Sequence, residues 1–248
     1  MRVAALYDVH GNTPALEATL VEVGPERVDA IVFGGDFVPG PFPRETLELV
    51  LGLGDRARFI RGNGERELLE IHEGRREARP GGLNDAWVGA QLTDEHRAFL
   101  RALPETVVLE VDGLGHVLFC HGSPRSDEEI LTAATTEGRL REAVGDVSEP
   151  VVVCGHTHMQ FDRTVERVRV VNAGSVGMPY GGDAGAHWAL LGPEVELRQT
   201  PYDVEAAAAR IRTSAYPLAG EFAEENVLTR PSAEEARELF ERMAEKDG

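Results

Sequence analysis

The sequence predicts an α/β fold in which two packed β-sheets are covered by outer helices. Three observations lead to this fold class. Apolar runs alternate with helix-like segments in the first third of the chain, which is typical of parallel βαβ units. The middle of the chain has apolar runs joined by short turns, which predicts antiparallel pairs. The tail from Asp203 onward has a helical pattern.

Strand and helix alternate from the N-terminus to about residue 61. The expected strands are Val3 to Tyr7, Ala30 to Gly34 and Ala57 to Arg61, and the expected helices are Thr13 to Val23 and Pro43 to Leu53. Each of these strands runs directly into a polar turn. Because ligands bind at the carboxyl ends of strands in open α/β sheets, we expect the three turns to converge.

Antiparallel pairing is predicted for most of the strands that follow. The expected strands are Val107 to Val111, His116 to Phe119, Pro150 to Cys154, Arg167 to Val171, His187 to Leu191 and Glu194 to Gln199. The turns Asp112-Gly113 and Gly192-Pro193 each join two of them as a hairpin.

A single domain is expected over residues 1–248, with its core over about residues 1–200 and a helical C-terminal extension over about residues 203–248. We find no internal repeat, low-complexity linker or break in composition that would divide the chain. The last helix, Ser232 to Lys246, starts with a capping box formed by Ser232 and Glu235.

The composition excludes several classes of partner. With 25 Lys and Arg against 43 Asp and Glu, the formal charge of −18 disfavours nucleic acid and anionic membranes. No apolar stretch is long enough to span a bilayer, and Met1 to Asp8 does not resemble a secretion signal, so we expect a cytoplasmic protein. Cys120 and Cys154 lie in apolar runs, where we expect buried strand residues without a disulfide.

Seven polar side chains follow the predicted strands, and all offer oxygen or imidazole nitrogen. They are Asp8, His10, Asp36, Asn63, His121, His156 and His158. Structural zinc sites favour cysteine, whereas this donor set suits two borderline divalent metals such as Mn, Fe, Co, Ni or Zn. Two four-ligand sites that share one carboxylate need seven ligands, which is the number available.

The same residues belong to five short motifs. In chain order they are Asp8-Val9-His10-Gly11-Asn12, Gly35-Asp36, Gly62-Asn63, Cys120-His121-Gly122 and Gly155-His156-Thr157-His158. Their joint pattern, over Arg2 to about Ser175, closely resembles that of the calcineurin-like metallophosphoesterases, in particular a small bacterial phosphodiesterase branch. The resemblance implies a four-layer αββα sandwich of two mixed sheets flanked by helices.

The resemblance also implies how the ligands are shared between two metal ions per chain. Asp8, His10, Asp36 and His158 would hold the first ion, and Asp36, Asn63, His121 and His156 the second, with Asp36 as the bridge. Manganese is the metal we expect first, with Fe, Ni, Co, Zn or Mg as alternatives. Asp36, Asn63 and His121 would be the catalytic residues.

The expected reaction is hydrolysis of phosphate diesters by attack of a metal-bridging hydroxide. Two divalent ions outweigh the charges of two carboxylates and one hydroxide, so the site of this acidic protein would be locally cationic. Asn12 and Asn63 are expected to donate hydrogen bonds to the phosphate oxygens, Asn12 from behind the metal ligands. Tyr180 and Arg125 are candidates to line a substrate pocket, and a place on the turn surface is the commoner alternative for such loop residues.

Two departures from the family pattern bear on the substrate. Many members have a histidine after Gly-Asn that protonates the leaving group, but Gly64 stands there in this chain, followed by Glu65. Losing a general acid costs about 10²- to 10⁴-fold, so we expect diesters with acidic leaving groups to be preferred. Gly40 replaces the phosphate-binding arginine of phosphoprotein phosphatases, which argues against that activity.

Two other functions stay open on the sequence alone. One is a phosphomonoesterase acting on nucleotides or phosphoproteins, and the other is a non-catalytic metal-binding scaffold. The expected partner in either enzyme is a small phosphate ester, and association into a homo-oligomer stays open as well.

Overall fold

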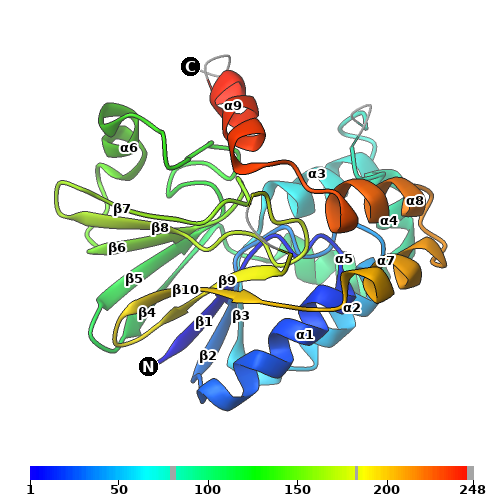
Figure 1. The fold of residues 1–248 in the computed structure, drawn as a ribbon, viewed down its shortest axis with the longest axis horizontal. Helices are drawn as coiled ribbons and strands as arrows, with labels where there is room; N and C mark the ends of the chain where they lie inside the picture. The colour runs from blue at the N-terminus through cyan, green and yellow to red at the C-terminus, as the bar shows by residue number, and fades with distance from the viewer. Residues whose placement is uncertain (79–81, 182–183, 245–248) are drawn as a thin grey trace.

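Two mixed five-stranded sheets pack face to face in the computed structural model, which describes residues 1–78, 82–181 and 184–244 (Figure 1). From edge to edge, the first sheet contains β10 (Val195–Thr200), β9 (Ala186–Leu191), β1 (Val3–Leu6), β2 (Ala30–Phe33) and β3 (Ala57–Phe59). The second contains β4 (Thr106–Val111), β5 (Gly115–Cys120), β6 (Val151–Cys154), β8 (Val168–Asn172) and β7 (Phe161–Val165).

The strands of the first third of the chain are parallel and the two predicted hairpins are antiparallel, as the sequence predicts. In the first sheet β1, β2 and β3 are parallel, with Val3 opposite Ala30, while β9 and β10 are antiparallel neighbours. In the second sheet β5, β6 and β8 are parallel, and the edge strands β4 and β7 are antiparallel to them. Strand β7 was not predicted, because its inner residues are polar or only half-buried.

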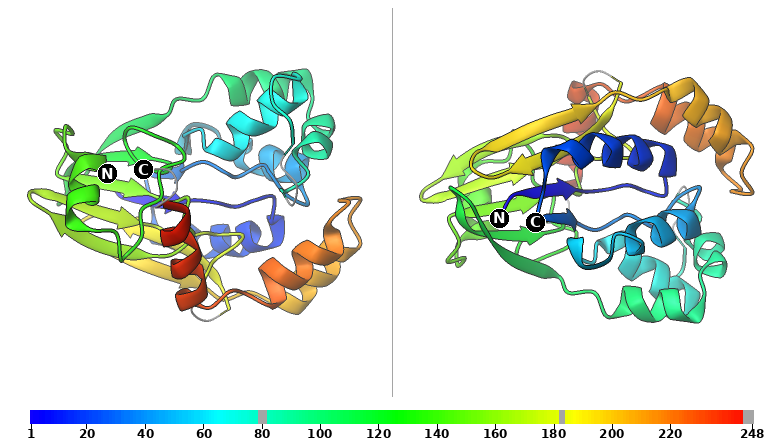
Figure 2. Two further views of the ribbon diagram at one scale, coloured as in Figure 1. Left: turned by 90° about the horizontal axis from the view of Figure 1, so that it is seen from above. Right: turned by 90° about the horizontal axis from the view of Figure 1, so that it is seen from below.

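Helices cover the outer face of each sheet (Figure 2). Those whose apolar residues share a core with the first sheet are α1 (Thr13–Val23), α2 (Pro43–Leu51), α3 (Asn63–His72), α4 (Asp85–Gln91), α5 (Asp94–Arg101), α7 (Val204–Arg212) and α8 (Ala219–Phe222). Helix α6 (Glu137–Val144) packs on the second sheet. Two 3₁₀ turns, Gly24–Glu26 and Gly54–Arg56, and a π-helix, Ala223–Leu228, complete these layers.

Strand β1 lies at the centre of this arrangement because both of its faces are buried. Ala4 and Leu6 pack against the helices, whereas Val3, Ala5 and Tyr7, just beyond the strand, pack against the second sheet. This alternation follows from the two-residue period of a strand. The Tyr7 hydroxyl donates to the Val153 carbonyl of the opposite sheet at 3.0 Å, which satisfies its buried polar atom. Two sheets between helical layers confirm the predicted α/β fold class.

Helix α9 (Ala233–Ala244) follows the last sheet strand and the helices α7 and α8. Its first turn has the expected capping box, in which Ser232 N–H donates to the Glu235 carboxylate at 3.0 Å and Glu235 N–H donates to Ser232 Oγ at 3.2 Å. Lys246, the predicted end of this helix, lies outside the described residues. No helix in the described ranges is long and apolar enough to cross a lipid bilayer.

Candidate metal centre

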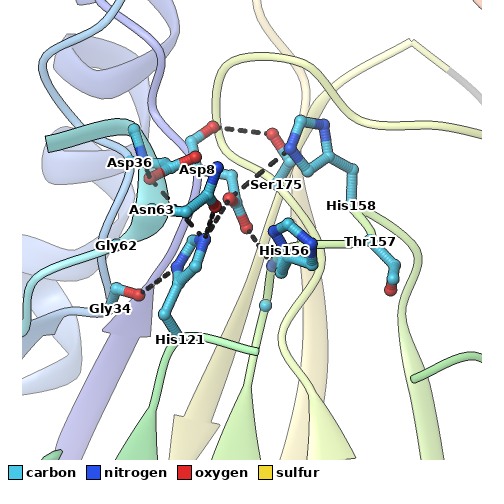
Figure 3. Close-up of polar contacts among 12 residues, drawn as sticks. Asp8, Gly34, Asp36, Gly62, Asn63, His121, His156, Thr157, His158 and Ser175 are labelled. Carbon is cyan, nitrogen blue, oxygen red and sulfur yellow. Dashed lines mark hydrogen bonds and ion pairs between the residues drawn. The ribbon is translucent and has the colours of Figure 1, made fainter. Parts of the chain in front are cut away.

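The predicted ligands gather where β1, β2, β5 and β6 end and where α3 begins (Figure 3). Because parallel strands end at a common edge of their sheet, loops from both sheets meet at this point. Cys120 and Cys154, the last residues of β5 and β6, are buried and free, and they pack in the core on the other face of the second sheet. The centre is therefore built from oxygen and nitrogen donors without thiolates.

Five of the seven predicted ligands have a left-handed backbone, which is rare for residues other than glycine. They are Asp8 (φ 52°), His10 (φ 46°), Asp36 (φ 53°), His156 (φ 65°) and His158 (φ 57°). Such conformations cost on the order of 1–3 kcal/mol each and persist only where surrounding contacts enforce them. Hydrogen bonds between the loops supply that enforcement. His10 N–H donates to the Asp36 carbonyl at 2.9 Å, and Asp8 N–H donates to the Gly35 carbonyl at 3.1 Å.

Asp8, His10 and His158 form the first cluster of ligand atoms. The Nε2 atoms of His10 and His158 lie 3.1 Å apart, and Asp8 Oδ1 lies 3.4 Å from His158 Nε2 and 3.8 Å from His10 Nε2. His158 Nδ1 donates to the Met178 carbonyl at 2.8 Å, so a neutral ring presents a lone pair at Nε2. Nitrogens that bind one ion at about 2.0–2.1 Å lie roughly 3–3.5 Å apart, as these do.

Asp36 and His121, together with Asp8, form the second cluster. His121 Nε2 lies 3.0 Å from Asn63 Oδ1, 3.6 Å from Asp36 Oδ1 and 3.8 Å from Asp8 Oδ1. Its Nδ1 donates to the Gly34 carbonyl at 2.8 Å, which fixes the tautomer that leaves a lone pair at Nε2. The other oxygen of Asp36, Oδ2, lies 3.9 Å from His10 Nε2, so this carboxylate lies between the two clusters.

His156 lies at the margin of the centre and is only half-buried. Its backbone N–H donates to Asp8 Oδ2 at 2.9 Å, and its ring centroid lies 5.2 Å from that of His121 (Figure 3). The two clusters found among the described residues do not include its ring nitrogens. The structure thus brings six of the predicted ligands together and places the seventh ring beside them.

The charges at the centre fit a cation. Asp8 Oδ1 is buried without a hydrogen-bond partner among the described residues. Burial, together with the charge of His158, lowers the pKa of His10 to about 3, and burial with the charge of His121 lowers that of His156 to about 3. Both rings are neutral at physiological pH, the form that binds metal. Burial and the nearby carboxylates of Glu65 and Asp8 raise the pKa of Asp36.

The structure places the three candidate substrate-contacting residues Asn12, Arg125 and Tyr180 in different surroundings. The Asn12 amide donates to the Gly177 carbonyl at 2.9 Å and accepts from Ala15 N–H at 3.3 Å, so Asn12 caps α1. This cap could have been predicted, because Asn directly precedes the helix at Thr13 and Pro14. Arg125 pairs with Glu129 at 2.5 Å, whereas Tyr180 stacks on His158 with centroids 4.9 Å apart.

Two residues hold the metal-binding turns in place, and the sequence analysis did not predict this role for either of them. The Ser175 hydroxyl donates to the Asp8 carbonyl at 2.7 Å and so holds the turn after β1 (Figure 3). The Glu65 carboxylate accepts four backbone N–H bonds around Asp36. Each Glu65 oxygen accepts two of these bonds, so the ionised form fits even though burial raises the pKa of Glu65.

A mixed α/β sandwich with carboxylate, amide and imidazole ligands at its strand ends defines a metallophosphoesterase class of fold. The chain belongs to the calcineurin-like phosphoesterase superfamily, whose domain model matches residues 1–193.

Among solved structures, a metallophosphoesterase from Sphaerobacter thermophilus is 27% identical with a TM-score of 0.73, covering 92% of this chain and 99% of that one. A hypothetical protein from Pyrococcus horikoshii OT3, 21% identical with a TM-score of 0.75 over 90% of this chain and 97% of that one, shares the fold.

Curated relatives fall into two groups. An uncharacterized protein of Methanocaldococcus jannaschii is 24% identical over 236 residues, which are 87% of this chain and 93% of that protein. A symmetrical bis(5′-nucleosyl)-tetraphosphatase of Psychromonas ingrahamii is 36% identical over 100 residues, and one of Klebsiella pneumoniae subsp. pneumoniae is 33% identical over 136 residues. These matches cover 39% and 54% of this chain but only 36% and 47% of the two tetraphosphatases.

Proposed function

We propose that the chain is a phosphodiesterase that uses two divalent metal ions held by the seven predicted ligands. The observation that carries this proposal is that three histidines converge on one buried carboxylate oxygen, which has no hydrogen-bond partner among the residues that the structure describes. Asp8 Oδ1 lies 3.4–3.8 Å from the Nε2 atoms of three histidines that come from three different loops, His10, His121 and His158. Burying a carboxylate oxygen that receives no hydrogen bond is costly, so this arrangement favours a site that binds cations.

The residues of the centre have separable tasks in this proposal. When bound, the metal ions would supply a water of lowered pKa and positive charge for the phosphate oxygens. Asp36 presents one oxygen toward His121 and the other toward His10, which suits the bridging role. The tautomers of His121 and His158 are set by the carbonyls of Gly34 and Met178, so both rings present lone pairs toward the centre. Manganese remains our first choice of metal.

The preference for diesters rests on what surrounds Gly64. This residue has no side chain, and its backbone N–H already donates to Asp36 Oδ1 at 2.7 Å. Glu65 is fully buried and directs both oxygens at backbone N–H groups, so it does not donate a proton. Without an acid from the start of α3, leaving groups that depart as stable anions are favoured. Small aryl or nucleotide diesters meet this requirement, and the tetraphosphatase relatives support the nucleotide class.

The test compares esters that share a leaving group. Protein freed of metal by chelation and reloaded with Mn²⁺ is assayed with bis(p-nitrophenyl) phosphate and with p-nitrophenyl phosphate. We expect kcat/KM to be at least tenfold higher for the diester and to fall steeply as the leaving-group pKa rises. A higher value for the monoester would establish a phosphomonoesterase instead. Failure to hydrolyse any activated ester with metal bound would leave the scaffold as the function.

A further inference from the structure

A cavity of about 290 Å³ lies beside the metal centre, between the loop after His158, the Tyr180 segment and α9. Ligand pockets measure roughly 300 to 1,000 Å³, so this cavity suits one compact group and not an extended strand. The lining residues with side chains that could recognise a ligand are Thr132, Met159, Gln160, Tyr180, His187 and Arg237.

The cavity shares a wall with the metal centre. The rings of Tyr180 and His158 stack with centroids 4.9 Å apart and an interplanar angle of 26°, and Tyr180 N–H donates to the His158 carbonyl at 3.3 Å. Met159, which follows His158 directly, also lines the cavity. A substrate whose phosphate lies at the His158 side of the centre therefore has this cavity next to it.

Helix α9 lines the cavity through Ala233 and Arg237, and specific contacts hold the helix there. Gly181 N–H donates to the Pro231 carbonyl at 3.0 Å just before the helix. The Phe240 ring lies 6.0 Å from that of Tyr180, and the Glu241 carboxylate accepts a hydrogen bond from the Thr132 hydroxyl. The wall is thus part of the fold, because residues on two other loops fix its position.

Arg237 is an unpaired cation at the rim of this cavity. It is exposed, and within the described ranges it has no hydrogen-bond or ion-pair partner, although the chain has a formal charge of −18. Its helix neighbour Arg242 pairs with Glu238 at 3.7 Å, and Arg210 pairs with Glu17 at 2.7 Å. His187 is buried and neutral, because burial and the charge of Arg230 lower its pKa to about 4. The cavity thus offers one positive charge beside neutral polar and aromatic groups.

We infer that this cavity is a substrate subsite that binds a phosphorylated nucleoside group of the diester, with Arg237 pairing with a phosphate beyond the scissile one. This assignment rests on the proposed function and narrows its substrate class. The guanidinium matches phosphate oxygens through two parallel N–H bonds, and the Tyr180 and Met159 side chains offer an apolar wall to a base. Aryl diesters without a further phosphate would use the metal centre alone.

A larger hollow, of about 620 Å³, is less suited to such a substrate. It is lined by Glu128, Glu129 and Glu142 as well as Arg125 and Arg139, and the Arg125 guanidinium is bound by Glu129. Three carboxylates would repel a phosphate, and none of its lining residues belongs to the metal centre. Charge therefore favours the smaller cavity.

The experiment distinguishes substrate binding by the subsite from catalysis at the metal centre. Wild type, Arg237→Ala and the control Arg242→Ala, which changes an arginine of α9 that does not line the cavity, are loaded with Mn²⁺. They are assayed with bis(5′-adenosyl) tetraphosphate and with bis(p-nitrophenyl) phosphate. For Arg237→Ala we expect KM for the tetraphosphate to rise about tenfold with kcat unchanged, because the lost contact binds ground state and transition state alike. KM for the aryl diester should change less than twofold, and the control should match wild type.

Binding of the tetraphosphate, measured by calorimetry with Ca²⁺ in place of Mn²⁺ to slow turnover, provides a second readout. A tenfold weaker Kd for Arg237→Ala supports the subsite, and equal Kd or KM values for the three proteins overturn it. If no ester is hydrolysed, the proposed function fails, yet the comparison of Kd values still decides the subsite.

Discussion

The Glu65 carboxylate holds the turn that carries Asp36. Glu65 Oε2 accepts the backbone N–H of Asp36 at 2.7 Å and that of Gly62 at 3.0 Å, while Oε1 accepts those of Phe37 and Val38 at 2.9 and 3.1 Å. Glu65 is fully buried, so water cannot replace these bonds. The left-handed backbone of Asp36 is thereby fixed by a side chain from α3, the helix that also presents Asn63.

We predict that Glu65→Gln weakens metal binding more than it weakens the fold. The amide NH₂ would face two backbone N–H donors, so two hydrogen bonds are lost and Asp36 is released from its position. Removing a residue that orients a metal ligand typically costs about 10- to 100-fold in metal affinity. Titration of the metal-free protein with Mn²⁺ measures this loss.

Glu70→Gln is the matched control for this substitution. Glu70 lies on the same helix and pairs with Arg66 at 3.7 Å and with Arg76 at 3.5 Å, but it does not contact the Asp36 turn. It should leave Mn²⁺ affinity within about twofold of wild type. Equal affinities for Glu65→Gln and wild type would show that Asp36 keeps its position without this clamp.

Asp36→Asn is expected to reduce metal content more than Asp8→Asn. Asp36 has a separate oxygen near each cluster, whereas Asp8 reaches both clusters with Oδ1 alone, because its Oδ2 accepts the His156 N–H. The asparagine variant at position 36 should therefore lose both ions, and that at position 8 mainly one. Equilibrium dialysis against Mn²⁺ gives the stoichiometry. More metal bound by Asp36→Asn than by Asp8→Asn would identify Asp8 as the bridge.

Much of this architecture is predictable because the signals are local. The turns after β1, β2 and β6 follow directly on short apolar runs, and an Asp or His in such a turn points to the carboxyl edge whatever the rest of the fold does. The apolar spacing predicted the start and end of α1 to the residue. Strand ends were predicted within two residues.

The remaining features depend on contacts between distant segments, which a single sequence does not show. The role of Glu65 requires knowing that the β2 turn packs against the start of α3, 29 residues away along the chain. Tyr180 stacks on His158, and α9 lies beside Tyr180. Both contacts likewise depend on how the C-terminal part of the chain folds back onto the centre. The short helices α4, α5 and α6 have seven or eight residues each, too few for a clear helical period.

Gly64→Ala is predicted to displace Asp36. A Cβ at this position would lie 2.8 Å from Asp36 Oδ1 and 2.9 Å from Pro39 Cγ, closer than real contacts allow. Gly64 is not among the residues with positive φ, so the obstacle is space near the ligand and not backbone strain. We expect at least tenfold weaker Mn²⁺ binding.

The control is Gly138→Ala in α6, where a Cβ meets nothing within 4 Å. It should raise stability slightly, by about 0.5–1 kcal/mol, and leave metal affinity unchanged. The same crowding means that Gly64→His cannot simply restore a general acid, because the histidine Cβ meets the same atoms. Unchanged Mn²⁺ affinity in Gly64→Ala would show that Asp36 and Pro39 move apart at little cost.

The buried His187 should make the metal-free protein less stable as the pH falls. Burial, with the charge of Arg230, lowers the pKa of His187 to about 4 in the folded state, against an ordinary value of 6.5 in the unfolded chain. Between these values the unfolded chain binds a proton that the folded protein does not, so stability is lost as the pH falls from about 6.5 toward 4. From pH 7.5 to pH 5, this one group accounts for about 2 kcal/mol.

Urea unfolding in the presence of a chelator, at both pH values, measures this contribution. His187→Gln is neutral throughout, so the loss of unfolding free energy between pH 7.5 and pH 5 should be about 2 kcal/mol smaller than in wild type. His10 and His156 contribute equally to both proteins and cancel in the difference. His116→Gln, which changes an exposed histidine on β5, should reproduce the wild-type loss. An equal loss in wild type and His187→Gln would mean that the His187 ring takes up its proton without unfolding, through an opening of the cavity beside α9.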